Sequence, residues 1–200
     1  IEDANLNVQG IRNSGLLTAG GSDQKAMERY LGESLTLRAM IYFDLVKFFG
    51  DVPFKTEPTL SDLSNAYLPK TDRDEIMDAL INDLEEAVDL LPWADDVTGY
   101  TTEHVTKGYV HGLIAQIALT RAGYAIRESA KSGYETASYS DQTYPTQRPD
   151  AATRKALYEK ALSHLSAIIT SGKHSLNPSF ENHWTLINQL TLDQSYHENL

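Results

Sequence analysis

Five aromatic residues lie in the segments of the chain that are richest in polar and turn-forming residues. Trp93 and Tyr100 lie in one such segment, and Tyr134, Tyr139 and Tyr144 lie in another. Aromatic faces that loops present on a rigid scaffold can stack on the C–H faces of sugar rings. We therefore take these five residues as candidate ligand-binding residues. The alternative is that the rings pack the loops onto their own scaffold.

Histidine and acidic side chains show no convincing metal-binding pattern. His104 and His111 are seven residues apart, which on a helix separates them by roughly 10 Å of rise, too far to hold one ion. Residues 72–96 carry ten acidic side chains against one base, Arg73. Such a run can form a calcium site or an electronegative docking face, but it is also typical of a solvated outer helix face. Because the run lacks the alternating oxygen ligands of a calcium loop, we expect no metal and no cofactor, with calcium as the alternative.

The sequence contains no catalytic signature. It has no G-x-S-x-G, no G-x-G-x-x-G, no H-E-x-x-H and no cysteine, which excludes a nucleophile elbow, a Cys nucleophile and Cys-ligated metal. We therefore expect no catalytic residue and no enzyme activity. The many carboxylates leave one alternative, an α-helical carbohydrate-active enzyme that uses a pair of acids about 5–10 Å apart.

The elements that must carry these segments are helices. Apolar residues recur every three or four positions over residues 26–49, 72–91, 103–122 and 153–171, which predicts four helices. No long window alternates apolar and polar residues as a half-buried strand would, so the predicted fold class is all-α. The tyrosines that lie on these helical stripes, and are expected in the core, are Tyr30, Tyr42, Tyr109 and Tyr158.

The predicted helices fall into two pairs, which is the pattern of stacked helical hairpins in an α-solenoid. A tetratricopeptide-like hairpin needs a small residue where its helices cross, and Ala39, Ala87, Ala115 and Ala161 can serve. Long insertions break the repeat period. Residues 124–150 are long for a plain connection, which indicates either a functional loop or a disordered one.

Arg38 is a candidate structural residue. It lies near the buried stripe of the first long helix, which is apolar on two sides. A buried guanidinium needs a carboxylate partner, and Asp83 lies on the inner edge of the next helix. We therefore predict an ion pair between Arg38 and Asp83 that ties the first hairpin together.

Composition narrows the classes of protein further. The chain has 200 residues, of which 41% are apolar, enough for one domain with a real core. The formal net charge of −11 makes nucleic acid a poor partner, because affinity for phosphates comes mostly from Lys and Arg. No window approaches the ~18 uninterrupted apolar residues of a membrane span.

One stretch of the chain is more specific than these statistics. Residues 37–53 read LRA-x-x-YFDLV-x-x-FGDVP, and Leu91-Pro92, Thr106-Lys107-Gly108 and Ser171-Gly172 follow in order. Together these strings resemble the SusD/RagB family of surface nutrient-binding lipoproteins, over about residues 26–180. The family motif commonly has Ala where this chain has Ser34, and no ligand residue of the family matches a motif here.

The resemblance implies several expectations. The fold would be an all-α scaffold of tetratricopeptide-like hairpins with long insertions, and residues 1–200 would be one helical domain from a longer SusD-like protein. The function would be non-catalytic binding of oligosaccharides at the cell surface and their delivery to a SusC-like TonB-dependent transporter. The protein would be held on the outer membrane by an N-terminal lipid anchor that lies outside this chain. A peptide-binding member of the same family is the alternative.

Overall fold

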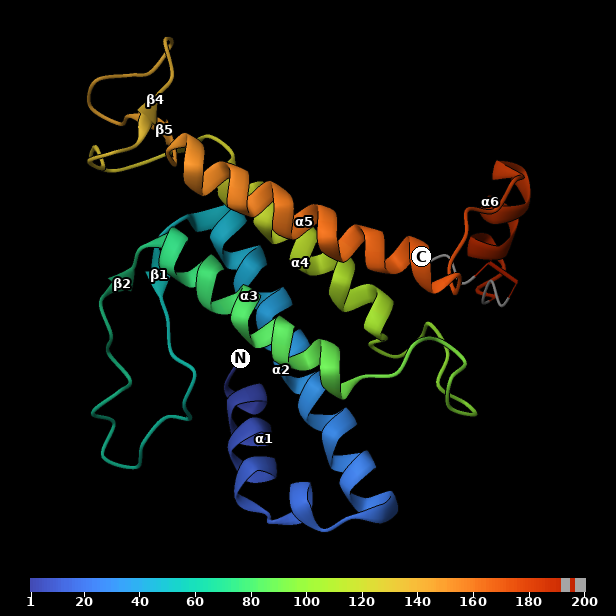
Figure 1. The fold of residues 1–200 in the computed structure, drawn as a ribbon. Coiled ribbons are helices and arrows are strands. Elements are labelled where there is room, and N and C mark those ends of the chain that lie inside the picture. Colours follow the sequence, from blue (N-terminus) through green and yellow to red (C-terminus); the bar gives the residue numbers. More distant parts are fainter. Residues whose placement is uncertain (192–194, 197–200) are drawn as a thin grey trace.

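The computed structural model of the protein describes residues 1–191, 195 and 196. Helices dominate this part of the chain, which confirms the predicted all-α class (Figure 1). The helices are α1 Glu2–Asn13, the short 3₁₀ helix η1 Leu16–Thr18, α2 Gly21–Phe49, α3 Arg73–Leu90, α4 Lys107–Ala122, α5 Ala151–Ser171 and α6 Phe180–Asn188. The strands are β1 Val52–Pro53, β2 Lys70–Thr71, β3 Ala125–Ile126, β4 Glu135–Thr136 and β5 Thr146–Arg148.

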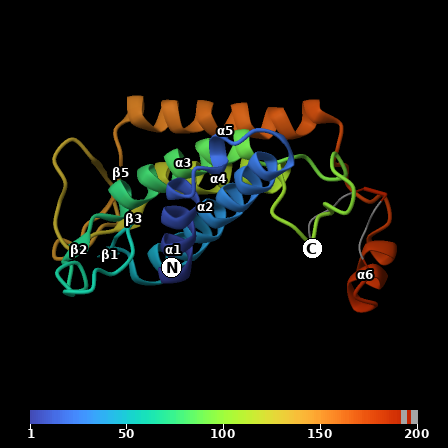
Figure 2. The same cartoon turned by 90° about the horizontal axis from the view of Figure 1, so that it is seen from below.

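Two helical hairpins form the scaffold, as predicted. Helix α2 packs against α3, α4 packs against α5, and α3 also packs against α4. Seen from below, α5 lies along one side of the molecule and covers the layer of α2, α3 and α4 (Figure 2). The core between these helices is apolar, and its largest fully buried hydrophobic side chains are Leu35, Phe43, Ile76, Leu80, Leu84, Val110, Ile114 and Ile117.

The ends of the helices follow from their capping residues. The side chains of Asp72, Thr106 and Asp150 accept backbone N–H hydrogen bonds at the starts of α3, α4 and α5. Because Thr106 is the cap, α4 begins at Lys107 and not near residue 103, as the apolar pattern predicted. Gly172 ends α5 in a left-handed conformation with φ of 65°.

The N-terminal part is more helical than predicted. Helix α2 starts at Gly21, before residue 26 where its apolar pattern begins, and α1 lies alongside it (Figure 1). Asn5 of α1 is fully buried, and its Nδ2 donates to the carbonyl oxygens of Lys55 and Glu57, 3.3 and 3.1 Å away. One buried amide therefore ties α1 to the connector that follows α2.

Residues 124–150, hereafter the insertion, are neither a plain loop nor disordered. They form a three-stranded antiparallel sheet in the order β3-β5-β4, in which Gln147 pairs with Ala125 on one side and Thr136 on the other. Each strand has only two or three residues, too few to produce a readable alternation in the sequence.

The predicted core tyrosines divide into two groups. Tyr42 is 2% exposed and Tyr109 is partly buried, as expected. The prediction for Tyr30 and Tyr158 is wrong, because they are 51% and 47% exposed. These two rings lie on faces of α2 and α5 that no other described element covers.

Candidate functional site

Tyr100, one of the two aromatic candidates in the connector between α3 and α4, is built into the scaffold. It is 6% exposed, and its hydroxyl lies 2.9 Å from Glu33 Oε1 and 2.6 Å from the carbonyl oxygen of Val105. Burial, reinforced by the Glu33 carboxylate, raises the pKa of Tyr100. The ring of His104 stacks on it with a centroid distance of 4.6 Å. Tyr100 therefore packs the connector onto α2 and is not available to stack on a sugar.

Trp93, the other candidate in this connector, is partly exposed. Its ring stacks on that of His111 at a centroid distance of 5.5 Å and an interplanar angle of 22°. His111 Nδ1 lies 2.7 Å from His164 Nδ1, across the seam between α4 and α5. Burial, aided by the charges of His164 and Lys107, lowers the pKa of His111 to about 4, so its ring is neutral at neutral pH. Trp93 thus packs the connector onto this seam.

The three tyrosines of the insertion have different surroundings. Tyr134 faces inward, donates its hydroxyl to Asp74 Oδ2 at 2.7 Å, and has the Arg127 guanidinium 4.7 Å from its ring centre. Tyr139 and Tyr144 are 75% and 57% exposed. These two are the candidates whose faces are most open to a ligand.

The five aromatic candidates do not form one site. The connector with Trp93 and Tyr100 precedes α4, and the insertion follows it (Figure 1). Helix α4 has 16 residues, so about 24 Å of helix separates the two groups. A single sugar ring cannot bridge them.

Tyr144 contributes to a cavity of about 280 Å³, which we call the aromatic hollow. The hollow lies between the C-terminal end of α2 and the insertion. Phe48 and Phe49 of α2 are 80% and 72% exposed, and Ile126 of β3 is 63% exposed. Its full lining is Lys47, Phe48, Phe49, Gly50, Asp51, Arg73, Ile126, Arg127, Glu128 and Tyr144. Exposed rings from two separate segments therefore border one concavity.

Polar groups line the same hollow. The Asp51 carboxylate accepts from the Arg73 backbone N–H at 3.1 Å and from Arg73 Nε at 3.3 Å. Gly50 makes this arrangement possible, because its φ is +74° and a Cβ there would lie 2.0 Å from Arg73 Nη2. An ion pair bordered by aromatic rings offers donors and acceptors to sugar hydroxyls beside faces for stacking.

The sequence did not single out Phe48 or Phe49 for this role. Both fall on apolar stripes of α2, which predicted burial, yet their side chains project at the last turn of the helix. The available signal was their position directly before Gly50 and Pro53, where the helix must end.

The amino-acid sequence of the chain matches one known family. Residues 4–119, more than half of the chain, match the SusD-like family described as starch-binding and associating with the outer membrane. The chain belongs to the SusD-like family. The resemblance inferred from residues 37–53 is therefore confirmed.

Individual SusD-like relatives agree in sequence and fold. SusD-like protein P2 of Formosa agariphila is 28% identical over 117 residues, which cover 58% of this chain and 22% of the relative. A solved SusD homolog from Bacteroides thetaiotaomicron is 25% identical with a TM-score of 0.73, covering 96% of this chain and 31% of that one. A laminarin-binding SusD-like protein is 27% identical with a TM-score of 0.50, covering 61% of this chain and 24% of that one. The chain spans less than a quarter of the length of the curated relatives it matches.

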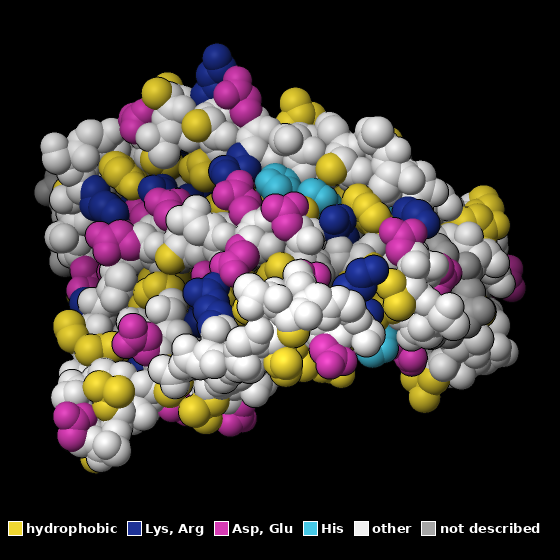
Figure 3. All heavy atoms as spheres, turned by 60° about the horizontal axis from the view of Figure 1, so that its bottom comes forward, with side chains coloured by type: hydrophobic (Ala, Val, Ile, Leu, Met, Phe, Trp, Pro, Cys, Tyr) yellow, Lys and Arg dark blue, Asp and Glu magenta, His cyan; other side chains and the backbone are white. Residues whose placement is uncertain are grey.

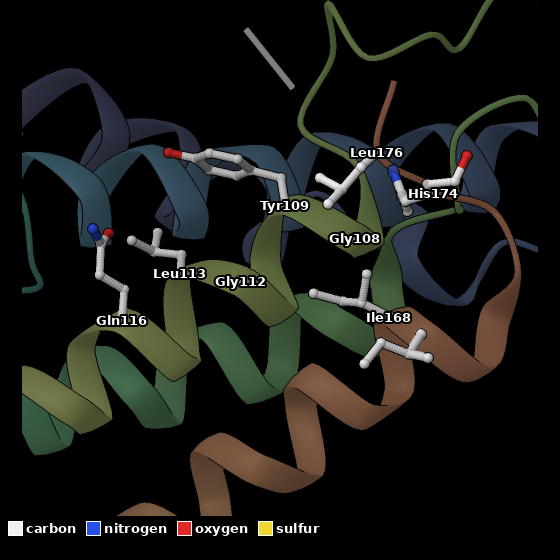
Figure 4. Close-up of a pocket in the computed structure, with 10 residues that line it drawn as sticks. Gly108, Tyr109, Gly112, Leu113, Gln116, Ile168, His174 and Leu176 are labelled. Atoms are coloured by element: carbon white, nitrogen blue, oxygen red, sulfur yellow. The ribbon is translucent and has the colours of Figure 1, made fainter. Parts of the chain in front are cut away.

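A second, larger cavity of about 590 Å³ lies between α4, the end of α5 and the segment that follows it. Figure 4 shows Gly108, Tyr109, Leu113 and Gln116 of α4 on one side of it, with Ile168, His174 and Leu176 on the other. Gly108 packs closely here, because a Cβ would lie 2.2 Å from His174 Nε2 and the imidazole would have to shift. The lining of this cavity has one tyrosine, Tyr109, whereas the aromatic hollow has Phe48, Phe49 and Tyr144.

The acidic run of residues 72–96 has a role that the sequence did not indicate. At least seven of its ten acids pair with cations from other elements, on α1, α2, α4, α5, the insertion and the segment after α5. The pairs are Asp72–Lys131, Asp74–Arg127, Asp78–Arg121, Asp83–Arg38, Glu85–Lys160, Glu86–Arg12 and Asp96–Lys173. On the face drawn in Figure 3, acidic and basic side chains are accordingly interspersed.

The Arg38–Asp83 pair has the predicted partners. Arg38 is 3% exposed, and its Nη2 donates to Asp83 Oδ2 at 2.6 Å. Its Nη1 donates to Asn5 Oδ1 at 3.1 Å and to the Thr56 carbonyl oxygen at 2.9 Å. One guanidinium therefore joins α1, α2, α3 and the connector after α2.

Among residues 1–191, 195 and 196, no group of three or more His, Asp or Glu side chains is placed to hold a metal ion. Within that range, no helix has both the length and the apolar character needed to cross a bilayer.

Proposed function

We propose that this chain belongs to a surface protein that binds oligosaccharides without cleaving them and delivers them to a SusC-like TonB-dependent transporter. The observation that carries the proposal is the aromatic hollow, in which Phe48, Phe49 and Tyr144 stand exposed around the Arg73–Asp51 pair. Membership of a family described as starch-binding supports the choice of ligand class. The laminarin-binding relative supports it further.

Binding at the hollow would combine two kinds of contact. The faces of Phe49 and Tyr144 would stack on the apolar faces of sugar rings, while Arg73 and Asp51 would hydrogen-bond to ring hydroxyls. Tyr139, which is exposed on the same insertion, would extend the stacking surface for a longer glycan. The partly exposed ring of Trp93 lies at the far end of α4 and would need a separate ligand segment.

We further propose an outer-membrane location and a transporter as partner. A lipid anchor would hold the protein on the outer face of the outer membrane, and the transporter would receive the bound glycan. Co-purification of a TonB-dependent transporter with the tagged protein from detergent-solubilised outer membranes is the expected result. Recovery of the protein from the soluble periplasmic fraction would contradict this location.

The direct test is native affinity electrophoresis through gels that contain different polysaccharides, with a reducing-sugar assay on the same samples. We expect retardation in at least one gel and no release of reducing ends. Release of sugar would refute non-catalytic binding and would favour the helical carbohydrate-active enzyme. If the protein is not retarded in any gel and releases no reducing ends, glycan binding is refuted and the peptide-binding alternative is favoured.

Variants link the binding to the hollow. Phe49→Ala and Tyr144→Ala each remove an exposed ring, so the fold should be retained while glycan affinity falls by roughly five- to a hundredfold, as loss of a stacking ring does. Tyr67→Ala is the matched control, because Tyr67 is 90% exposed and is not part of the hollow. Equal affinities for all three variants would place the glycan elsewhere.

A further inference from the structure

The insertion contributes little apolar packing. The main hydrophobic core of the described chain has no member between Ala122 and Leu157, and Ala137, Pro145 and Pro149 of the insertion are buried outside it. Its three strands are too short to be independently stable, since small sheets need an apolar face packed against other elements. Polar contacts are therefore expected to contribute much of what fixes its position on the scaffold.

Those contacts converge on one buried carboxylate. Asp74 Oδ2 accepts from Tyr134 Oη at 2.7 Å and lies 2.9 Å from both Lys131 Nζ and Arg127 Nη1. All three donors belong to the insertion. Arg121 of α4 adds a third positive charge, with Nη1 3.6 Å from Asp74 Oδ1.

Asp74 itself is held on the rigid part of the molecule. It is 3% exposed and lies in the first turn of α3, whose next residues Ile76 and Leu80 are completely buried in the core. A carboxylate in the first turn is also stabilised by the helix dipole. Strong hydrogen bonding and the neighbouring cations lower the pKa of Asp74 in spite of its burial, so it stays ionised. The position of this charge is therefore set by α3, and the insertion aligns to it.

The same contacts connect Asp74 to the aromatic hollow. Arg127, which pairs with Asp74, lines the hollow together with its chain neighbours Ile126 and Glu128. We propose that Asp74 is a positioning residue for glycan binding: it docks the insertion on α3 and so holds Ile126 and Tyr144 opposite Phe49. This inference rests on the proposed function, because it assigns Asp74 a role at that same site.

Removal of the carboxylate would do more than delete hydrogen bonds. Arg121, Arg127 and Lys131 would face one another with no buried counter-charge, and leaving such charges uncompensated is strongly unfavourable. The scaffold has little reason to change, because the core residues of α2, α3 and α4 do not depend on the insertion. The expected result is an insertion released from an intact scaffold.

Glu135 offers a matched comparison. It also binds several donors, with Arg148 Nη2 at 2.7 Å and Arg154 Nη1 at 2.8 Å, but its side chain is 45% exposed. Water can replace its contacts, and exposed ion pairs contribute little to stability. Glu135→Gln should therefore leave the insertion in place, whereas Asp74→Asn should release it.

The experiment combines amide hydrogen exchange with affinity for the glycan that retards the wild-type protein. In Asp74→Asn we expect exchange of the paired amides of β3 and β5 to rise by at least roughly tenfold, with α2 and α4 unchanged, as breaking a buried ion pair predicts. Trypsin should cut at Arg127 and Lys131 in this variant, and glycan affinity should fall by a similar factor. Glu135→Gln should change each quantity by less than about threefold.

Several outcomes would overturn the inference. Unchanged exchange in β3 and β5 of Asp74→Asn would show that Asp74 does not dock the insertion. Faster exchange with unchanged glycan affinity would show that docking does not position the site. If Asp74→Asn fails to fold, Lys131→Met with Tyr134→Phe removes two of the contacts from the insertion side and must give the same result. If the wild-type protein binds no glycan, the proposed function fails, while the exchange data still decide whether Asp74 docks the insertion.

Discussion

The pair of histidines between α4 and α5 makes a quantitative prediction about acid stability. His111 is 8% exposed, and its Nδ1 shares a hydrogen bond of 2.7 Å with His164 Nδ1. Burial is the main reason that the pKa of His111 falls to about 4, and it also lowers the pKa of His164. Lys107 opposes protonation of His111 and Asp89 favours it. Protonating both rings would place two positive charges in contact within the seam.

The direction and the magnitude of the change in the free energy of unfolding with pH follow from linked protonation. The pKa of His111 is lower in the folded state than the ordinary value of 6.5, so the unfolded state binds the proton first as the pH falls. The contribution of His111 is therefore complete above pH 6.5 and is lost as the pH falls toward 4. A folded pKa of about 4 gives a loss of roughly 1.4 kcal/mol by pH 5.5 and roughly 2.5 kcal/mol by pH 4.5.

Urea unfolding followed by far-UV circular dichroism between pH 7.5 and 5.5 measures this loss. Few carboxylates titrate in this range, so the change is assigned by comparing the wild type with His111→Asn, whose amide can still reach His164 Nδ1. We expect the free energy of unfolding to fall by about 1.4 kcal/mol more in the wild type than in the variant. His104→Asn, which removes a half-exposed ring, should behave like the wild type. Equal pH dependence in the wild type and His111→Asn would refute the reasoning.

Three further predictions concern stability at neutral pH. Arg38→Ala leaves the partly buried Asp83 without its cation, so the free energy of unfolding in urea should fall by about 3–5 kcal/mol. A fall below ~1 kcal/mol would contradict the role of the pair. Gly50→Ala forces a strained φ and places a methyl group against Arg73, so the free energy of unfolding, measured by thermal unfolding, should fall by about 1–3 kcal/mol. An unchanged Tm would mean that the turn can rearrange. Ile169→Asn should change stability by less than about 0.5 kcal/mol, because Ile169 is 78% exposed, and a larger loss in urea unfolding would show that this face is covered in solution.

The helical scaffold was predictable because its apolar stripes are long and regular. Over residues 153–171 the pattern correctly located α5, with Leu157 and Ala161 buried against α4. The same pattern does not indicate whether a second apolar stripe packs against another helix. Tyr158 and Leu162, on such a stripe of α5, are exposed. Helix α1 leaves little trace in the sequence, because only Asn5 and Val8 of its residues are buried, which is too little to produce a period.

The candidate site was predictable only in part. Of the loop aromatics, Tyr139 and Tyr144 in the insertion are exposed, and their role in binding stays a prediction. Tyr100 is buried instead, because a phenol can satisfy its hydroxyl inside a core, here against Glu33, and residue type alone does not reveal that arrangement. Phe49 meets the insertion through packing between segments distant in sequence, and local periodicity carries no information about such pairings.

The position of the insertion outside the main apolar core has a consequence for how the proposed binding preference could change. Sequence exchanges within a packed core require neighbouring side chains to adjust together, because interiors are close-packed. The tip of the insertion, including Tyr139 and Tyr144, contributes no residue to the main hydrophobic core. Its amino-acid sequence can therefore change without repacking of the helices. A graft of residues 138–144 that keeps Arg127, Lys131, Tyr134 and the buried Ala137 and Pro145 should therefore fold on the same scaffold. The fold separates the part that must stay constant from the part that is free to acquire a new specificity.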